Sequence, residues 1–240
     1  MSAYGAIAVR SRPTEPLAST VWSCKSRGPD SPQYLSLHHL TLAAAAQLPG
    51  LVSYLHGCFA EELERGLTYP QEVLPGETYT QETFEGYFFA ADVIVGIAGE
   101  GAAPAADGAP AALGVDDARR GRPWEACVAG VYYVKPNYPG RSSHICNAGF
   151  LIPSSQRAKG FGSVLARSYL YYGPRLGYEA SVFNLVYVNN IASVKLWEKL
   201  GFTKAGRIPR AGRLRTADGS GEEFVDAWVF YKQFEPIEKL

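Results

Sequence analysis

The sequence predicts a single α+β domain with a central, largely antiparallel mixed sheet flanked by helices. Three observations predict this fold class. Runs rich in β-branched and aromatic residues, which are typical of strands, recur along the chain. Runs with apolar residues at helical spacing lie between them, and one apolar strand leads through a loop with two glycines into a helix. At 240 residues the chain is long enough to bury one hydrophobic core.

The first part of the chain divides into an irregular segment and the start of the domain. Residues 1–32 are rich in Ser, Pro, Gly and Ala, which predicts a mostly irregular segment before a domain at 33–240. Residues 34–40 contain enough apolar side chains for a short strand. From about 48 to 65 apolar residues recur at helical spacing, and Gly66 then provides a helix stop.

The middle of the chain predicts a short helix at 80–85 and a buried strand at 88–98. Residues 99–123 are dominated by Ala, Gly, Pro and Asp, and such a stretch buries too little apolar surface to offset its ordering entropy. We therefore expect a flexible hairpin loop there, after which the sheet resumes at 127–134. The remaining expected elements are strands at 150–152, 178–188 and 224–231, and helices from about Gly160 to before Pro174 and from Asn190 to Gly201.

The charge balance and the cysteines narrow the possible partners and the compartment. Lys and Arg number 23 and Asp and Glu number 23, so net charge gives no argument for binding nucleic acid or an anionic membrane. The four cysteines include no Cys-x-x-Cys pair, which argues against a disulfide framework or a zinc site and favours a reducing compartment. No apolar run approaches the roughly 18 residues of a membrane span. We expect a cytoplasmic protein, with mitochondrial targeting by the acid-free stretch before Glu15 as the alternative.

The loop Arg157-Ala-Lys-Gly-Phe-Gly162 joins the apolar strand at 150–152 to the next helix. Free backbone N–H groups at a helix start and the positive end of the helix dipole both suit a pyrophosphate. Glycine is needed in such a loop because a Cβ would block the approach of the ligand to the backbone. The spacing matches neither a nucleotide-triphosphate loop nor the glycine pattern of a dinucleotide-binding fold.

These residues resemble the Arg/Gln-x-x-Gly-x-Gly/Ala signature of the GNAT superfamily of N-acetyltransferases, whose loop holds the pyrophosphate of acetyl-CoA. The run from Asn190 to Phe202 resembles the helix that follows in the same superfamily. The resemblance implies the GNAT fold, with acetyl-CoA bound at two splayed strands, its pantetheine arm paired along 150–152, and no metal. It implies the following cofactor-binding residues: Phe150, Leu151, Ile152, Arg157, Ala158, Lys159, Gly160, Gly162, Ser163, Asn190 and Ser193.

A narrower resemblance covers roughly residues 68–232 without the insert. Its motifs are Thr68-Tyr-Pro-Gln71, Lys135-Pro-Asn-Tyr138, Ser143-His144, Cys146-Asn-Ala-Gly-Phe-Leu151, Phe183-Asn-Leu-Val186 and the turn Pro209-x-Ala-Gly212. They resemble the fungal N-acetyltransferases that detoxify L-azetidine-2-carboxylate and act on cis-4-hydroxyproline. This implies acetylation of the secondary amine of a small cyclic imino acid by a homodimeric enzyme.

The usual acid and base of the superfamily are missing from this sequence. Trp197 stands where many members carry a tyrosine that protonates the leaving thiolate, and an indole is no acid at neutral pH. The strand at 146–152 contains no carboxylate. The resemblance instead places functional asparagines at Asn147, to orient the amine or stabilise the oxyanion, and at Asn184, to bind the carboxylate, while water removes the proton. From the residues alone, Asn184 equally satisfies a bulge or a neighbouring loop, and Asn190 caps its helix.

His144 and Leu185 complete the expected acceptor site. The pKa of a histidine lies near working pH, so His144 is a candidate general base, although a lone histidine at a strand start is more often a structural hydrogen-bonding residue. Cys146 is most simply a small buried side chain rather than an acyl-cysteine. A basic cluster is interpreted as a solvated face rather than a contact to the adenosine end of CoA: Lys204, Arg207, Arg210, Arg213 and Arg215.

Two alternatives stay open. A transferase for protein N-termini, lysines or polyamines would use acidic residues of the acceptor-side helices, which are more simply solvated: Glu61, Glu62, Glu64, Glu82 and Glu85. A non-catalytic sensor would have the same fold and bind acyl-CoA without transferring the acyl group. The absence of a tyrosine at Trp197 favours this alternative.

Overall fold

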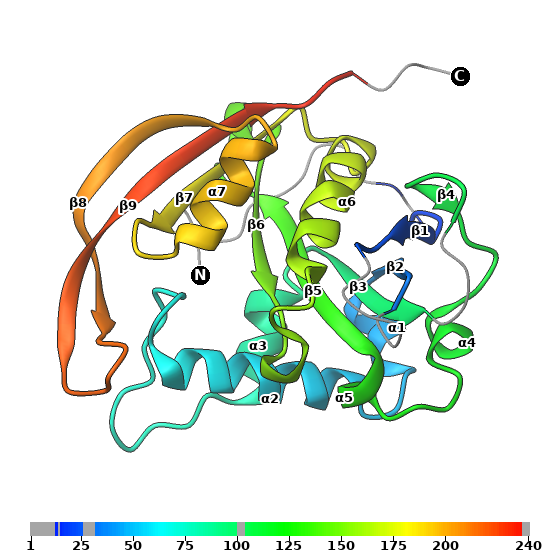
Figure 1. Cartoon of the computed structure of the whole chain (residues 1–240), viewed down its shortest axis with the longest axis horizontal. Coiled ribbons are helices and arrows are strands. Elements are labelled where there is room, and N and C mark those ends of the chain that lie inside the picture. The colour runs from blue at the N-terminus through cyan, green and yellow to red at the C-terminus, as the bar shows by residue number, and fades with distance from the viewer. Residues whose placement is uncertain (1–12, 14, 26–31, 100–103, 237–240) are drawn as a thin grey trace.

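The computed structural model describes residues 13, 15–25, 32–99 and 104–236. Their strands form one mixed sheet in the order β4-β1-β2-β3-β5-β6-β7-β9-β8, which confirms the predicted α+β class (Figure 1). Neighbouring strands are antiparallel except β6 and β7, which run parallel. The strands are β1 (Thr20–Ser23), β2 (Tyr34–Leu40), β3 (Asp92–Gly99), β4 (Ala109–Pro110), β5 (Val128–Pro136), β6 (Ile145–Leu151), β7 (Ala180–Tyr187), β8 (Thr203–Arg215) and β9 (Glu222–Gln233). The α-helices are α1 (Leu42–Ala46), α2 (Leu51–Arg65), α3 (Gln81–Phe88), α4 (Val115–Arg119), α5 (Trp124–Cys127), α6 (Phe161–Arg175) and α7 (Ile191–Lys199).

Two hydrophobic cores lie on opposite faces of the sheet, because side chains alternate along each strand. Helices α6 and α7 pack on one face over side chains such as Tyr132, Cys146 and Ala148. Helices α1 to α5 pack on the other face over side chains such as Tyr133 and Leu151. Helices α1 to α5 and helices α6 and α7 therefore lie on opposite sides of the central strand β6.

Strands β6 and β7 diverge soon after they begin. Their register covers Ile145 with Ala180 and Cys146 with Ser181, and the rest of β6 pairs with β5 alone among the described strands. Strand β7 is itself irregular, with a register shift against β9 between Phe183 and Val186. This divergence opens the sheet edge on which the site is built.

The β8–β9 hairpin arches away from the sheet on the left of Figure 1 and returns to the segment after α2. Arg215 N–H donates to the carbonyl of Gly66 at 3.0 Å, and Arg213 contacts Glu72 at 3.3 Å. The expected turn at Pro209-x-Ala-Gly212 is a bulge inside β8, where Arg210 has a φ of 51°. The hairpin therefore contacts the domain again at the segment 66–72, which follows α2.

Two segments predicted to be irregular or flexible contain regular structure. Within 1–32, Thr20–Ser23 forms β1, whose inward-facing Thr20 and Trp22 are buried, while residues 1–12, 14 and 26–31 lie outside the described residues. Within 99–123, of which 100–103 lie outside the described residues, β4 pairs with β1 and α4 packs Val115 and Ala118 into the core. These short elements were not predicted, because a few apolar residues in a Gly- and Pro-rich background form regular structure when distant strands supply the partners.

Two boundaries and one whole strand also differ from the prediction. Phe88 ends α3 and does not begin the following strand, which starts at Asp92. Helix α6 continues through Pro174 to Arg175, because the proline lies in the last turn, where Leu176 N–H still bonds to Tyr172. Strand β8 was not predicted at all, since most of its side chains are exposed on both faces and show no alternation.

Candidate functional site

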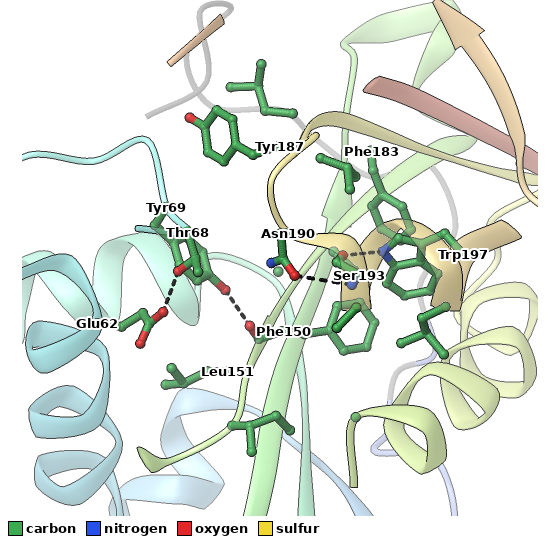
Figure 2. Close-up of a pocket in the computed structure, with 18 of the residues that line it drawn as sticks. Glu62, Thr68, Tyr69, Phe150, Leu151, Phe183, Tyr187, Asn190, Ser193 and Trp197 are labelled. Carbon is green, nitrogen blue, oxygen red and sulfur yellow. Dashed lines mark hydrogen bonds between the residues drawn. The ribbon is translucent and has the colours of Figure 1, made fainter. Parts of the chain in front are cut away.

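A cavity of about 890 Å³ lies where β6 and β7 diverge. Residues 147–151 of β6, the following Ile152 and residues 183–187 of β7 line it between the first turns of α6 and α7 and the segment 68–70. This volume lies within the range of small-molecule sites. Figure 2 shows Glu62, Thr68 and Tyr69 on one side of the Phe150 strand and Asn190, Ser193 and Trp197 on the other.

Backbone atoms of the loop 157–160, which precedes α6, lie beside this cavity. Ala158 and Gly160 have positive φ values of 60° and 85°, and α6 begins immediately after at Phe161. A Cβ built at Gly162 would meet no atom within 4 Å, so the absent side chain leaves open space beside the helix start. Helix-start N–H groups next to such space suit the pyrophosphate of acetyl-CoA. Ala158, Gly160, Gly162 and Ser163 all line the cavity.

The two basic side chains of the loop are engaged by the protein. The Arg157 guanidinium forms an ion pair with the buried carboxylate of Glu62, and its Nε donates to the carbonyl of Ile152 at 3.3 Å. Thr68 also donates its hydroxyl hydrogen to Glu62. Lys159 Nζ donates to Gln156 Oε1 at 2.9 Å, and Lys159 is not among the lining residues. Arg157 lines the cavity but fastens the loop to α2, so its charge is already neutralised within the protein.

We expect Glu62→Ala to lower the free energy of unfolding by about 3 kcal/mol, the lower end of the range for breaking a buried ion pair. The lower end applies because the Arg157 side chain is 35% exposed, so water partly solvates the charge that is left. Denaturant unfolding measures this. Glu61→Ala, on an exposed neighbour, should change stability by less than about 0.5 kcal/mol; equal effects for the two variants would contradict the role of the ion pair.

Three tyrosines lie beside β6: Tyr69 from the segment after α2, Tyr87 from α3 and Tyr133 from β5. Tyr69 donates its hydroxyl hydrogen to the carbonyl of Phe150 at 2.9 Å (Figure 2). Burial raises the pKa of Tyr69 well above its usual value, so the phenol stays a neutral donor. The Tyr87 and Tyr133 hydroxyls lie 2.9 Å apart, and the Tyr133 ring occupies the space that a Cβ at Gly149 would need. Tyr69 lies in the motif Thr68-Tyr-Pro-Gln71, which indicated its importance in the sequence, whereas Tyr87 lies in no motif.

The three asparagines have different surroundings. Asn147 lines the cavity, and its side chain makes no hydrogen bond with the described residues. Asn184 also lines the cavity but exchanges two hydrogen bonds with the Asn137 amide, at 2.6 and 3.1 Å, beside the irregularity of β7. Asn190 accepts from Ser193 N–H at 3.2 Å and caps α7, as expected. The structural partner foreseen for Asn184 is therefore present, and it is Asn137. Leu185, the next residue along β7, is a lining residue too.

Trp197 occupies the position of the missing tyrosine. Its indole N–H donates to Ser193 Oγ at 3.1 Å, and its ring packs 4.4 Å from that of Phe183. The side chain is buried in the wall of the cavity. It therefore shapes the site without offering an acidic proton.

Two expected candidates for chemistry lie elsewhere. His144 is exposed, donates from Nδ1 to the carbonyl of Arg141 at 3.1 Å, and does not line the cavity. This placement corrects its assignment to the acceptor site. Cys146 is buried 3.0 Å from the Tyr169 hydroxyl, and burial raises the pKa of its thiol to about 12, so it remains a thiol.

Across the described residues no group of three or more His, Cys, Asp or Glu is arranged to hold a metal ion. None of their helices combines the length and apolar character needed to cross a bilayer.

Comparison with known proteins gives a consistent result. Residues 59–202 match the model of the acetyltransferase (GNAT) family. N-acetyltransferase aca1 of Schizosaccharomyces pombe is 42% identical over 177 residues, which are 74% of this chain and 77% of that protein.

Solved structures share the fold. A GCN5-related N-acetyltransferase from Kribbella flavida has a TM-score of 0.59 at 22% identity and covers 83% of this chain and 97% of its own. The acetyltransferase yncA of Salmonella typhimurium, solved with acetyl-CoA, has a TM-score of 0.58 at 13% identity over 85% of this chain and 96% of its own. With the family match, the relative and a loop that fits a pyrophosphate, the chain belongs to the GNAT family and is an acetyltransferase that uses acetyl-CoA.

Proposed function

We propose that this enzyme acetylates the secondary amine of a small cyclic imino acid, such as L-azetidine-2-carboxylate or cis-4-hydroxyproline, and thereby detoxifies proline analogues. The observation that carries the proposal is the chemistry of the acceptor side of the cavity. It presents the amides of Asn147 and Asn184 and the phenols of Tyr87 and Tyr133. Glu62 is the one carboxylate among the described lining residues, and Arg157 neutralises it.

A cationic acceptor finds little support in this lining. Polyamines and lysine side chains carry charges that favour a carboxylate partner at close range. The other acidic residues of the acceptor-side helices do not line the cavity, including Glu61 and Glu64 on α2 and Glu82 and Glu85 on α3. Their role as solvated faces stands as the simpler interpretation.

The chain's own residues can divide the work as follows. Bound acetyl-CoA supplies the acetyl thioester. The Asn147 amide, which has no described protein partner, is placed to orient the amine or to donate to the oxyanion. The Asn137–Asn184 pair uses one N–H and one carbonyl of each amide, so Asn184 keeps a second N–H for the acceptor carboxylate. Cys146 stays protonated and His144 lies outside the cavity, so we assign the removal of the amine proton to water. Trp197 cannot donate a proton to the thiolate of CoA that leaves when the thioester bond breaks, so we assign that proton to water as well.

A thiol-release assay with acetyl-CoA tests the proposal. The acceptors are azetidine-2-carboxylate, cis- and trans-4-hydroxyproline, proline, spermidine, a lysine peptide and an N-terminal peptide. We expect kcat/KM for azetidine-2-carboxylate or cis-4-hydroxyproline to exceed that for every cationic or peptide acceptor by at least about tenfold, a difference near 1.4 kcal/mol in transition-state binding. Turnover confined to the cationic or peptide acceptors would refute the substrate class. Binding of acetyl-CoA without turnover of any amine would favour a sensor.

Two further properties belong to the same proposal. The resemblance of the sequence to the imino acid acetyltransferases supports a homodimer, which light scattering on the purified chain measures. All four cysteines are free thiols in the structure, which supports a reducing compartment such as the cytoplasm.

A further inference from the structure

A cation without a carboxylate partner among the described residues lies next to two tyrosines that line the cavity, Tyr87 and Tyr133. The Lys135 ammonium lies 3.9 Å from the ring centroid of Tyr87 and 4.2 Å from that of Tyr133. It also donates to the backbone carbonyl of Tyr87 at 3.3 Å. Both rings line the cavity, whereas Lys135 itself does not, so the ammonium lies one side chain away from the cavity, against the rings of its wall.

No carboxylate of the described residues lies within 4.0 Å of this ammonium. Partial burial lowers the pKa of Lys135 to about 8, because the charged form has lost water without gaining an anion. The faces of two aromatic rings attract the cation but do not neutralise it. The Lys135 ammonium therefore attracts an anion that binds beside Tyr87 and Tyr133.

The register of the sheet places this charge beside the functional asparagines. On one face of the β5–β6 pair, Tyr133 lies opposite Gly149 and Lys135 lies opposite Asn147. Directly opposite residues of antiparallel strands are near neighbours on the same face. Two residues further along the chain, Asn137 holds the amide of Asn184. The segment Lys135-Pro-Asn137 thus places the cation opposite Asn147 and two residues from the partner of Asn184.

We propose that Lys135 determines acceptor specificity by pairing its ammonium with the free carboxylate of the acceptor, which selects amino acids over amines that lack this group. The inference rests on the proposed function and adds a residue to it. The flexible four-carbon stem of lysine allows the ammonium to turn from the ring faces toward the ligand. The carboxylate then occupies the place of the missing counter-ion.

The test compares Lys135→Met and Lys135→Arg with two acceptors that differ in one group, azetidine-2-carboxylate and azetidine-2-carboxamide. We expect Lys135→Met to lower kcat/KM for the carboxylate by at least about tenfold, mainly through KM, and for the carboxamide by less than about threefold. Lys135→Arg keeps the charge and should retain most of the preference for the carboxylate. Lys204→Met is the matched control, because Lys204 also lies over an aromatic ring, that of Trp228 at 4.5 Å, but is paired with Glu198, and Trp228 does not line the cavity.

The pH dependence gives a second readout. The titratable groups against the ammonium are the phenols of Tyr87 and Tyr133, whose pKa values burial raises above the usual range. Lys135 is thus the group there that loses its charge near pH 8. The preference for the carboxylate over the carboxamide in the wild type, divided by that in Lys135→Arg at the same pH, should fall as pH rises through this value. The guanidinium keeps its proton, and the titration of the acceptor amines is common to both enzymes.

Equal losses for the two acceptors in Lys135→Met would overturn the inference and leave the proposed function intact. Wild-type turnover confined to amines without a carboxylate would overturn both. If Lys135→Met fails to fold, which acetyl-CoA binding measured by calorimetry would reveal, Lys135→Gln replaces it under the same criteria.

Discussion

Replacing Asn147 with alanine should lower kcat by about 10²–10³-fold, the loss found when one oxyanion-hole donor is removed. The reason is the position of this side chain: it lines the cavity beside the splayed edge of β6 and makes no hydrogen bond with the described residues. An amide without a structural partner contributes little to folding, so the melting temperature should change by no more than a few degrees. Steady-state kinetics and thermal unfolding measure the two effects.

Asn189→Ala is the control for this prediction. Asn189 lies in the turn after β7, is exposed and does not line the cavity, so its loss should leave kcat unchanged. Near-normal activity of Asn147→Ala would remove this residue from the chemistry. A large drop in stability without a drop in kcat would show that it has a structural role.

Replacing Gly162 with glutamate should weaken acetyl-CoA binding by at least about 100-fold, since juxtaposed like charges cost several kcal/mol. The open space beside the Gly162 Cα lies at the start of α6, where the pyrophosphate is expected. A carboxylate there repels the phosphates and fills their space. The fold should tolerate it, because a Cβ meets no atom within 4 Å and an acidic residue suits the first turn of a helix. Isothermal titration calorimetry reads the affinity.

Gly86→Glu supplies the comparison, because Gly86 is also a helical glycine with no atom within 4 Å of its absent side chain, and it lies on α3 outside the cavity. It should bind acetyl-CoA normally. Gly162→Ala separates volume from charge: it should weaken binding less than the glutamate does, and it should not lower stability, because alanine is the better helix former. Unchanged affinity in Gly162→Glu would place the pyrophosphate elsewhere.

The sequence predicted best where local pattern alone determines structure. Helix α2 follows from its apolar spacing and ends at Gly66, which takes the left-handed conformation expected of a helix stop. The loop before α6 follows in the same way from glycines whose positions have meaning only next to a helix start. The asparagine cap of α7 is local as well, since Asn190 and Ser193 are three residues apart.

The contacts that give these residues their roles were not predictable, because each joins distant parts of the chain. Glu62 and Arg157 are separated by 95 residues, and no local pattern indicates that the loop arginine is bound to α2. The partner of Asn184 is Asn137, 47 residues earlier, so the sequence leaves open whether the amide meets protein or ligand. Tyr69 reaches the carbonyl of Phe150 only because α2 and the segment after it pack across the sheet.

The most direct test of the account is a competition experiment with one pool of acceptors. Acetyl-CoA labelled in its acetyl group is incubated with the enzyme and equimolar azetidine-2-carboxylate, cis-4-hydroxyproline, spermidine and a lysine peptide, and mass spectrometry identifies the labelled products. We predict that the label appears first and predominantly on the ring nitrogen of an imino acid. Label that accumulates on spermidine or on the peptide, with the imino acids unmodified, would contradict the account.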